Sequence, residues 1–248
     1  LQECTPKLLH HLEPHLRKAG FGDVMREPLE TAASNGYECY FLGLATRSPL
    51  SAPLAHSSGY HRFAQTSMGR GLLYARVHHG IGSGGKIAHI ALGCTHLESF
   101  VGKEHQAYVI EVRRSQRREC IRRLEEMVRK HRCEAAVLMG DFNWQEKEDG
   151  ETDDILKRNW VDAWVAAGCP TNAKITCYWH RLDRCYVYVP PDVSPRMVVQ
   201  SVGLVGNKQG SLAGQKLNTG GKLKDLYPSD HRGLLVACSL QEVPILVD

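Results

Sequence analysis

Five short polar segments of this 248-residue chain carry side chains whose types suit the hydrolysis of a phosphoester. The segments are Leu1–Glu3, Thr95–Ser99, Gly140–Asn143, Leu182–Arg184 and Ser229–His231. A phosphodiester is anionic and repels nucleophiles, so its hydrolysis needs neutralised charge, an oriented water and a stabilised pentavalent transition state. Each segment occurs by chance elsewhere, and only their joint presence in this order indicates that chemistry.

The residue types in these segments divide the chemistry between them. Glu and Asp are the hard oxygen ligands that hold Mg²⁺, an ion that also keeps several waters and takes substrate oxygens. A carboxylate beside an amide, as in Asp141 and Asn143, can accept a proton from a water and fix its direction. A histidine held by a carboxylate can donate to phosphoryl oxygens.

Zinc chemistry is not indicated by the spacing of histidines and cysteines. The pairs His10–His11 and His78–His79 lack the i, i+4 or cysteine-paired spacing of zinc sites. The nine cysteines form no C-x-x-C pair, and an odd number without metal spacing fits buried free thiols in a reducing compartment.

The elements that must position these segments are strands together with two helices. Thr5 before Pro6 predicts the start of an amphipathic helix. The glycines of Gly80–Gly85 favour a turn between strands over a phosphate loop. Strands are predicted at Tyr37–Leu44, Leu72–Val77, Lys86–Cys94, Ala135–Met139, Arg184–Val189 and Gly233–Ser239. The polar segments therefore fall at strand ends, where α/β folds commonly place chemistry.

One long helix is predicted from Lys103 to His131, with an apolar face that includes Tyr108 and Val112. Two interpretations remain for its many cations: a solvated outer face, which we favour, or a track for nucleic acid. The cations are Arg113, Arg114, Arg117, Arg118, Arg122, Arg123, Arg129 and Lys130.

Composition sets broad limits on partners and location. The net charge of +4 and a pI near 8.6 lean mildly toward polyanionic partners. No apolar run approaches the roughly 20 residues that span a bilayer, and Leu1–Pro6 shows no signal peptide. We therefore expect no membrane partner. A chain that opens on Leu is expected to be a fragment or an excised domain.

The ordered motifs Gln-Glu, His-Leu-Glu-Ser, Gly-Asp-x-Asn, Leu-Asp-Arg and Ser-Asp-His resemble the endonuclease/exonuclease/phosphatase superfamily. Four longer segments are similar to its tyrosyl-DNA phosphodiesterase 2 subgroup: Thr66–Leu73, Thr95–Ser99, Val161–Trp164 and Tyr227–Leu235. The resemblance covers Leu1 to about Leu240. It implies a single α/β domain over residues 1–248, built as a four-layer sandwich of two central mixed sheets flanked by helices. It also implies a first strand upstream of Leu1.

The resemblance further implies roles for individual residues. Glu3 matches the metal ligand, and Asp141 with Asn143 matches the pair that activates the water. His231 matches the histidine that stabilises the phosphoryl group, and Asp183 the carboxylate that orients it. The remaining matches are Asp230 as an adjacent active-site aspartate and His96, Ser99 and Arg70 as phosphate contacts.

Two tryptophans, Trp164 and Trp179, suggest a groove in which bases stack, although core packing explains them equally well.

Three hypotheses of function follow. The first is Mg²⁺-dependent hydrolysis, with Mn²⁺ as the alternative ion, of the 5′-phosphotyrosyl bond between DNA and a trapped topoisomerase. Its partners would be DNA ends, single-stranded or with a 5′ overhang, and a repair role implies the nucleus, with the cytoplasm as alternative. The second is a related phosphoesterase acting on RNA ends, abasic sites or phosphoinositides. The third is a catalytically silent binding module. We expect a monomer.

Overall fold

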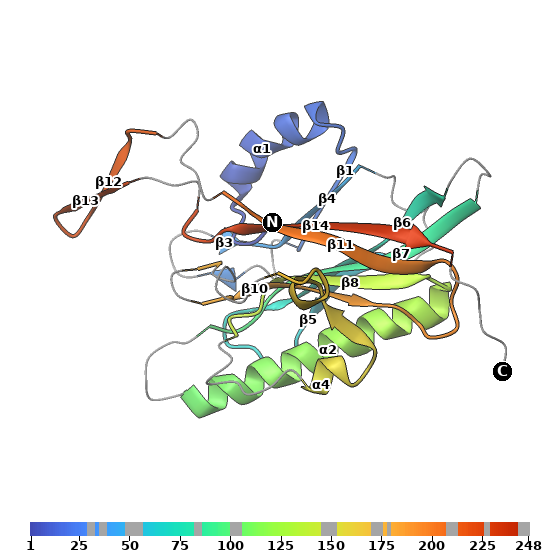
Figure 1. Ribbon diagram of the computed structural model, residues 1–248. Coiled ribbons are helices and arrows are strands. Elements are labelled where there is room, and N and C mark those ends of the chain that lie inside the picture. Colours follow the sequence, from blue (N-terminus) through green and yellow to red (C-terminus); the bar gives the residue numbers. More distant parts are fainter. Residues whose placement is uncertain are drawn as a thin grey trace.

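A six-stranded mixed sheet forms the centre of the molecule (Figure 1). The computed structural model describes residues 1–28, 33–34, 39–47, 57–81, 86–99, 106–144, 153–169, 176–177, 180–206, 213–225 and 229–242. In spatial order the strands are β5 (Ser58–Arg62), β6 (Gly71–Ile81), β7 (Lys86–His96), β8 (Ala135–Asp141), β10 (Asp183–Tyr188) and β9 (Trp160–Asp162). Strands β7 and β8 run parallel, whereas the other neighbours run antiparallel. The carboxyl ends of β7 and β8 therefore meet at one edge of the sheet.

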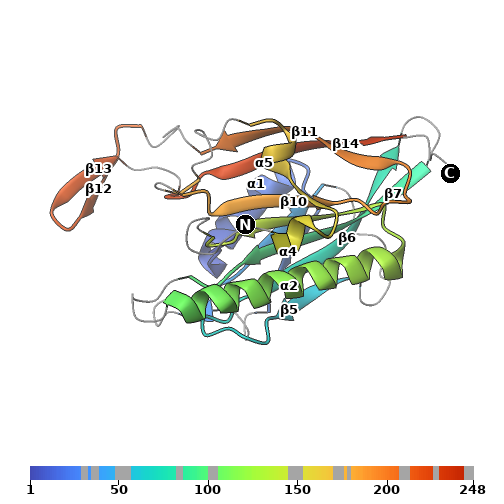
Figure 2. The same cartoon turned by 60° about the horizontal axis from the view of Figure 1, so that its bottom comes forward.

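Helix α2 (Gln106–His131) covers one face of this sheet (Figure 2). Its apolar stripe of Cys120, Ile121 and Leu124 is at most 2% exposed and packs into the main core. Gly93 on β7 allows the close approach, because a Cβ atom there would lie 2.8 Å from a methyl group of Leu124. Burial of each large apolar side chain contributes about 1.5–3 kcal/mol, and this stripe anchors the helix.

Two of the eight cations of α2 depart from the solvated face that the sequence suggests, whereas Arg118, Arg122, Arg129 and Lys130 are exposed as expected. Arg113 and Arg117 are 0% and 1% exposed, and the guanidinium of Arg117 lies 3.4 Å from the centroid of the Trp144 ring. Tyr108, expected on the apolar face, is instead 63% exposed. The expectation for Arg117 was wrong because the Trp144 ring covers its guanidinium on the face that periodicity assigns to solvent.

Two strand pairs cover the opposite face of the central sheet. The pair β11 (Arg196–Val205) and β14 (Gly233–Gln241) packs through Met197, Leu234 and Val236. The pair β1 (Asp23–Arg26) and β4 (Gly43–Thr46) lies beside it. The expected mixed α/β layers are present, but in the described residues the second central sheet consists of these separate pairs.

An apolar cleft of about 620 Å³ separates the two strand pairs. Leu1 and Leu44 line one side, Leu234 lines the other, and Leu92 and Met139 lie between them. The backbone of Leu1 exchanges hydrogen bonds of 2.9 Å with Gly43. The chain thus begins along the edge of β4, and the expected strand upstream of Leu1 stays a prediction.

The remaining elements are short apart from helix α1 (Pro6–Lys18), which Thr5 caps as predicted by accepting from the Leu8 amide at 3.1 Å. These elements are β2 (Ala33–Ser34), β3 (Cys39–Tyr40), α4 (Asp153–Leu156), α5 (Ala163–Ala166), β12 (Lys216–Thr219) and β13 (Lys222–Asp225). Strands β12 and β13 project as a hairpin from one end of the molecule (Figure 1).

Five of the six predicted strands are found within a few residues of their expected bounds. The strand predicted at Tyr37–Leu44 is instead divided into β3 and β4, which belong to different sheets. Residues 37–38 and 82–85 lie outside the described residues. The cysteines that the structure describes with side chains are free thiols, as expected. Burial holds for most of them, but Cys238 is exposed. Among the described residues no helix is both long and apolar enough to span a bilayer.

Candidate active site

Strand register brings three of the predicted site residues together at one edge of the central sheet. His96 ends β7 and is the register partner of Asp141, which ends β8. Asp183 begins β10 and is the partner of Asp141 on the other side. Neighbouring strands lie about 5 Å apart, so the three side chains form a row. Motifs 45 and 42 residues apart in the chain thus become neighbours.

Gly140, the residue before Asp141, occupies a position in this row that a larger residue does not fit. Its φ of 149° lies in a region that residues with a Cβ rarely adopt, and a Cβ there would lie 1.9 Å from the Thr95 carbonyl oxygen. That oxygen accepts a hydrogen bond of 3.2 Å from the side chain of Gln2. The glycine therefore lets the start of the chain lie across the strand ends.

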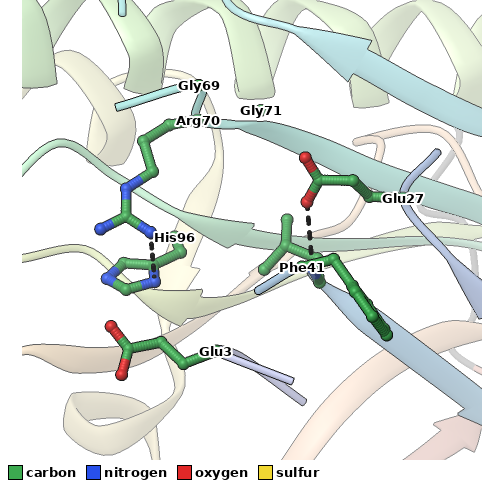
Figure 3. A pocket seen from close by; sticks show the side chains of 8 residues that line it. Glu3, Glu27, Phe41, Gly69, Arg70, Gly71 and His96 are labelled. Atoms are coloured by element: carbon green, nitrogen blue, oxygen red, sulfur yellow. Dashed lines mark hydrogen bonds between the residues drawn. The ribbon is translucent and has the colours of Figure 1, made fainter. Parts of the chain in front are cut away.

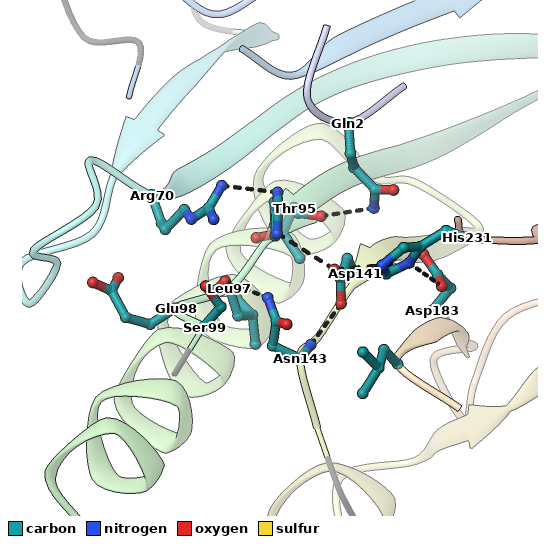
Figure 4. A network of polar contacts seen from close by, with 12 residues as sticks. Gln2, Arg70, Thr95, Leu97, Glu98, Ser99, Asp141, Asn143, Asp183 and His231 are labelled. Atoms are coloured by element: carbon teal, nitrogen blue, oxygen red, sulfur yellow. Dashed lines mark hydrogen bonds and ion pairs between the residues drawn. The ribbon is translucent and has the colours of Figure 1, made fainter. Parts of the chain in front are cut away.

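Asp141 is the more enclosed of the two carboxylates in this row, at 5% exposure. Its Oδ1 accepts from the Asn143 amide at 2.7 Å, and its Oδ2 lies 3.4 Å from His96 Nε2 (Figure 4). Burial, and then the charge of Asp183, raise the pKa of Asp141 to about 6. A carboxylate with this pKa can take up a proton near neutral pH, which suits a general base.

His231 is held by Asp183 across a 2.8 Å hydrogen bond from Nδ1 to Oδ2. The same nitrogen lies 4.0 Å from Asp141 Oδ2. The Asp183 hydrogen bond, acting against partial burial and helped by the charges of Asp183 and Asp141, raises the pKa of His231 to about 9. His231 is therefore an imidazolium at neutral pH, and its Nε2–H is left to donate elsewhere.

His96 has the opposite charge state. Burial, then the charges of Arg70 and His231, hold the pKa of His96 well below its ordinary 6.5. Arg70 Nη1 lies 2.8 Å from His96 Nδ1, and since a guanidinium only donates, Nδ1 accepts and Nε2 carries the proton. The neutral His96 therefore donates toward Asp141, so Arg70 determines the tautomer.

The loop that carries Arg70 is fixed by Glu98, which is 2% exposed. The Glu98 carboxylate accepts from Thr66 Oγ1 at 2.8 Å, from the Met68 amide at 2.9 Å and from both donors of Ser67. Burial raises the pKa of Glu98, but these bonds and that of Gln116 outweigh burial and lower it. Glu98 is thus an ionised carboxylate that holds this loop in place. The sequence motif did not suggest this role.

The other predicted polar residues lie around the row. Asn143 has a φ of 47° and its Nδ2 donates to the Leu97 carbonyl at 3.0 Å, so its Oδ1 is left without a hydrogen bond from a described residue. Ser99 Oγ lies 3.3 Å from Met68 Sδ (Figure 4). Asp230 is exposed and close enough to His231 for its charge to act on the imidazole.

Glu3 lies at a small pocket next to this row, with Arg70 and His96 in the opposite wall. Figure 3 shows its carboxylate directed toward the His96 ring. Backbone hydrogen bonds of 3.0 and 2.9 Å between Cys4 and Phe41 fix the segment, and Glu3 has a φ of 49°. The predicted metal ligand is therefore brought beside His96 and Arg70 from far away in the sequence.

Trp164 does not offer a surface for stacking. It is 6% exposed in α5, which packs against β10 and β11. Asp162 caps this helix and accepts from the Trp164 amide at 3.0 Å. Its burial leaves the packing interpretation for Trp164, and Trp179 lies outside the described residues.

Two residues at this edge were missed by the sequence reasoning. Thr176 is 1% exposed, and its Oγ1 accepts from the amides of Leu182 and Asp183 at 3.0 Å each, which fixes the start of β10. Cys177 is 5% exposed beside the carboxylates, and burial followed by the charge of Asp230 raises its pKa to about 12. No local motif marks either residue, because their partners are distant in sequence.

Comparison with known proteins supports the fold through structure alone. No protein-family model matches the chain, and no curated protein matches it. TDP2 from C. elegans is similar, with a TM-score of 0.64 and 20% identity over 97% of this chain. This chain spans 64% of that protein, less than two thirds of its length.

Two further solved structures share this likeness. D. rerio TDP2 complexed with a single-strand DNA product has a TM-score of 0.62 and 19% identity, over 96% of this chain and 84% of that chain. An endonuclease/exonuclease/phosphatase from Bacteroides vulgatus has a TM-score of 0.61 and 18% identity, over 97% and 83%. At these identities the likeness shows the fold, which is that of the endonuclease/exonuclease/phosphatase proteins.

Proposed function

We propose that the chain is a metal-dependent phosphodiesterase that hydrolyses the 5′-phosphotyrosyl bond between DNA and a trapped topoisomerase. The observation that carries this proposal is the juxtaposition of two buried carboxylates, Asp141 and Asp183, with a neutral His96 and a cationic His231. The neutral His96 supports the general base Asp141, whereas the cationic His231 can stabilise negative charge. The two charge states therefore separate base catalysis from electrostatic stabilisation. A binding module has no need of that separation.

Asp141 acts as the general base in this proposal. Its Oδ1 is occupied by the Asn143 amide, and Oδ2, next to His96, accepts a proton from the attacking water. Asn143 directs its free Oδ1 at the same water, because its Nδ2 is bound to Leu97. His96, held as a donor by Arg70, keeps Oδ2 in place.

His231 stabilises the charge that develops on the phosphoryl group. Asp183 binds Nδ1, so the imidazolium presents Nε2–H to a phosphoryl oxygen. A preorganised cationic donor of this kind commonly contributes about a hundredfold or more to the rate. Arg70, which lines the pocket with Glu3, adds positive charge for the phosphate.

The residues present fit a hard divalent cation such as Mg²⁺, with Mn²⁺ as the alternative. Mg²⁺ is usually held by one or two carboxylates together with waters and phosphate oxygens. Glu3 offers an exposed carboxylate that has no hydrogen bond to a described residue and that faces the pocket at His96. Glu3 would hold the ion, whose chemistry is to polarise a phosphoryl oxygen as a Lewis acid.

The substrate part of the proposal is supported by the neighbours and by charge. The D. rerio TDP2 neighbour is complexed with a single-strand DNA product, and the net charge of this chain is +4. DNA ends, single-stranded or with a 5′ overhang, that carry a tyrosyl adduct are the proposed partners. A repair role in the nucleus follows from that substrate.

A second candidate is a phosphoesterase of the same fold with another substrate. The Bacteroides vulgatus endonuclease/exonuclease/phosphatase has a TM-score close to those of the TDP2 structures. The described row of residues suits any phosphodiester and contains no group specific for a tyrosyl ring. The chemistry therefore holds for both candidates.

The test is release of tyrosine from an oligonucleotide with a 5′-phosphotyrosyl end, measured in Mg²⁺ and in EDTA. We expect metal-dependent release that His231→Ala lowers about a hundredfold or more. His180→Ala is the control, because His180 is exposed and neighbours Cys177 rather than Asp183. Cleavage of a generic phosphodiester without tyrosyl release would support the second candidate. Cleavage of neither substrate would refute a phosphoesterase activity.

A further inference from the structure

Three potential metal ligands from distant segments meet beside the proposed catalytic row. Cys177 Sγ, a carboxylate oxygen of Asp230 and a ring nitrogen of His231 all lie within 4.8 Å of one another. Glu3, the proposed Mg²⁺ ligand, is not a member of this group. The sequence spacing predicted no zinc site, because Cys177 lies 53 residues before Asp230 in the chain.

The backbone holds this group in place without a metal. Cys177 forms antiparallel bridges with His231 on one side and with His180 on the other. The Arg232 amide donates to the Thr176 carbonyl at 2.7 Å, and the Cys177 and His180 amides and carbonyls are bonded at 3.0 and 2.8 Å. Two neighbouring segments of the chain therefore carry the ligands, and their donor atoms already lie within 4.8 Å of one another.

The surroundings of Cys177 favour a cation. The thiol is 5% exposed and makes no hydrogen bond to a described residue. The carboxylates of Asp230, Asp141 and Asp183 all lie near enough for their charges to act on it. A divalent cation bound there would deprotonate the coordinating thiol and be attracted by the three carboxylates.

We propose that Cys177, Asp230 and His231 form a second metal site, selective for Zn²⁺, that inhibits the enzyme when it is occupied. One thiolate, one imidazole and one carboxylate are a ligand set typical of Zn²⁺, and the fourth position stays open for water or an anion. Mg²⁺ prefers oxygen ligands alone, so the thiolate discriminates between the two ions.

Inhibition follows from the role of His231 and rests on the proposed function. A ring nitrogen that binds Zn²⁺ cannot also present a proton to a phosphoryl oxygen. The ion also draws the imidazole toward Cys177 and competes with the 2.8 Å bond to Asp183. Zn²⁺ therefore removes the cationic donor while leaving Glu3 available to Mg²⁺.

Metal binding is tested without activity by titrating the metal-free protein with Co²⁺, which takes zinc sites and absorbs in the near ultraviolet when a thiolate binds it. We expect this band to saturate at a single Co²⁺ per chain and to vanish when Zn²⁺ is added. Cys177→Ser should lack the band. Cys238→Ser is the matched control and should keep it, because Cys238 is the exposed thiol.

Asp230→Asn is the second variant, chosen because Asp230 is exposed and its replacement does not threaten the fold. It should keep the band with at least about tenfold weaker Co²⁺ affinity, since even loss of a group that only supports a ligand costs that much. An absent band in the unmodified protein, or an equal band in Cys177→Ser, would overturn the site.

The inhibitory role is tested by adding Zn²⁺ to the tyrosyl-release assay at constant Mg²⁺. Each protein is compared with its own zinc-free rate, and we expect Cys177→Ser to need at least about tenfold more Zn²⁺ for half inhibition. Equal sensitivity of the two proteins would refute inhibition through this site. The cobalt band without any phosphodiesterase activity would refute the proposed function and leave the metal site standing.

Discussion

Replacing Asp183 by Asn should move the whole pH–rate profile of the enzyme toward acid. The unmodified protein should show a bell-shaped profile with an acid limb near pH 6, from Asp141, and an alkaline limb near pH 9, from His231. Asp183 is the first cause of the raised pKa of His231 and the second cause, after burial, of the raised pKa of Asp141. Removing its charge therefore lowers both pKa values.

The magnitude can be worked from the His231 pKa. A rise from 6.5 to about 9 corresponds to roughly 3 kcal/mol of preference for the imidazolium. In Asp183→Asn the amide still accepts the hydrogen bond, but the charge is lost and burial opposes protonation. We expect the alkaline limb to fall to about pH 7, so that the rate at pH 8 drops roughly tenfold below its own maximum.

The Asp183→Asn substitution should also lower the stability of the fold. The folded-state pKa of His231 lies above its unfolded value, so its stabilisation is complete below pH 6.5 and is lost as the pH rises through about 9. Asp183→Asn should therefore lower the unfolding free energy by up to about 3 kcal/mol at pH 6 and by less at pH 10. Urea unfolding at the two pH values measures this difference.

Asp162→Asn is the matched control. Asp162 is also a buried aspartate at the sheet, and it accepts from Arg181 at 3.0 and 2.7 Å. It lies on β9, which pairs with β10 on the side away from β8, and its register partner is Tyr186 rather than Asp183. The control should lower stability and leave both limbs in place. An alkaline limb that stays near pH 9 in Asp183→Asn would refute the assignment of His231.

Four other substitutions test the support of the site. Glu98→Gln should lower the free energy of urea unfolding by about 3 kcal/mol at pH 7, because the charged acceptor of the loop donors is lost. The pKa of Glu98 is lowered in the fold, so its stabilisation fades as the pH falls, and the difference should shrink near pH 3. Gly140→Ala should cost about 2 kcal/mol or more in thermal unfolding, and a neutral result would contradict the φ of 149°. Arg70→Gln should lower kcat about tenfold or more by releasing the His96 tautomer, with an unchanged kcat opposing that role. Glu3→Gln should raise the Mg²⁺ concentration for half-maximal rate at least about tenfold, and an equal requirement would remove Glu3 as ligand.

The strand ends of the site were predictable from sequence, whereas their spatial order was not. Apolar runs ending in His96 and Asp141 predict strands with polar ends, and both strands are present. That β8 lies between β7 and β10 depends on pairings across 45 and 42 residues. Contacts of that separation leave no local pattern, so the row of three residues emerges only in the fold.

Helix periodicity misled where another segment covers the helix. The pattern of α2 assigns Arg113 and Arg117 to solvent, yet Arg117 stacks on Trp144, and Arg184 of β10 lies 5.4 Å from the same ring. A guanidinium can be buried when its plane contacts an aromatic face and its nitrogen atoms keep partners. A run of arginines on a helix therefore does not by itself indicate a surface for nucleic acid.

The acid–base assignment at Asp141 comes from environment rather than from residue type. Two histidines flank this carboxylate, and the sequence alone gives no reason for them to differ. His96 is enclosed beside a guanidinium, which forces it neutral, whereas His231 is partly exposed beside Asp183, which keeps it charged. Exchanging these surroundings would exchange the roles, because a neighbouring carboxylate raises the pKa of an imidazole and a neighbouring cation lowers it. The partners Arg70 and Asp183 thus decide which histidine can meet a phosphate as a cation.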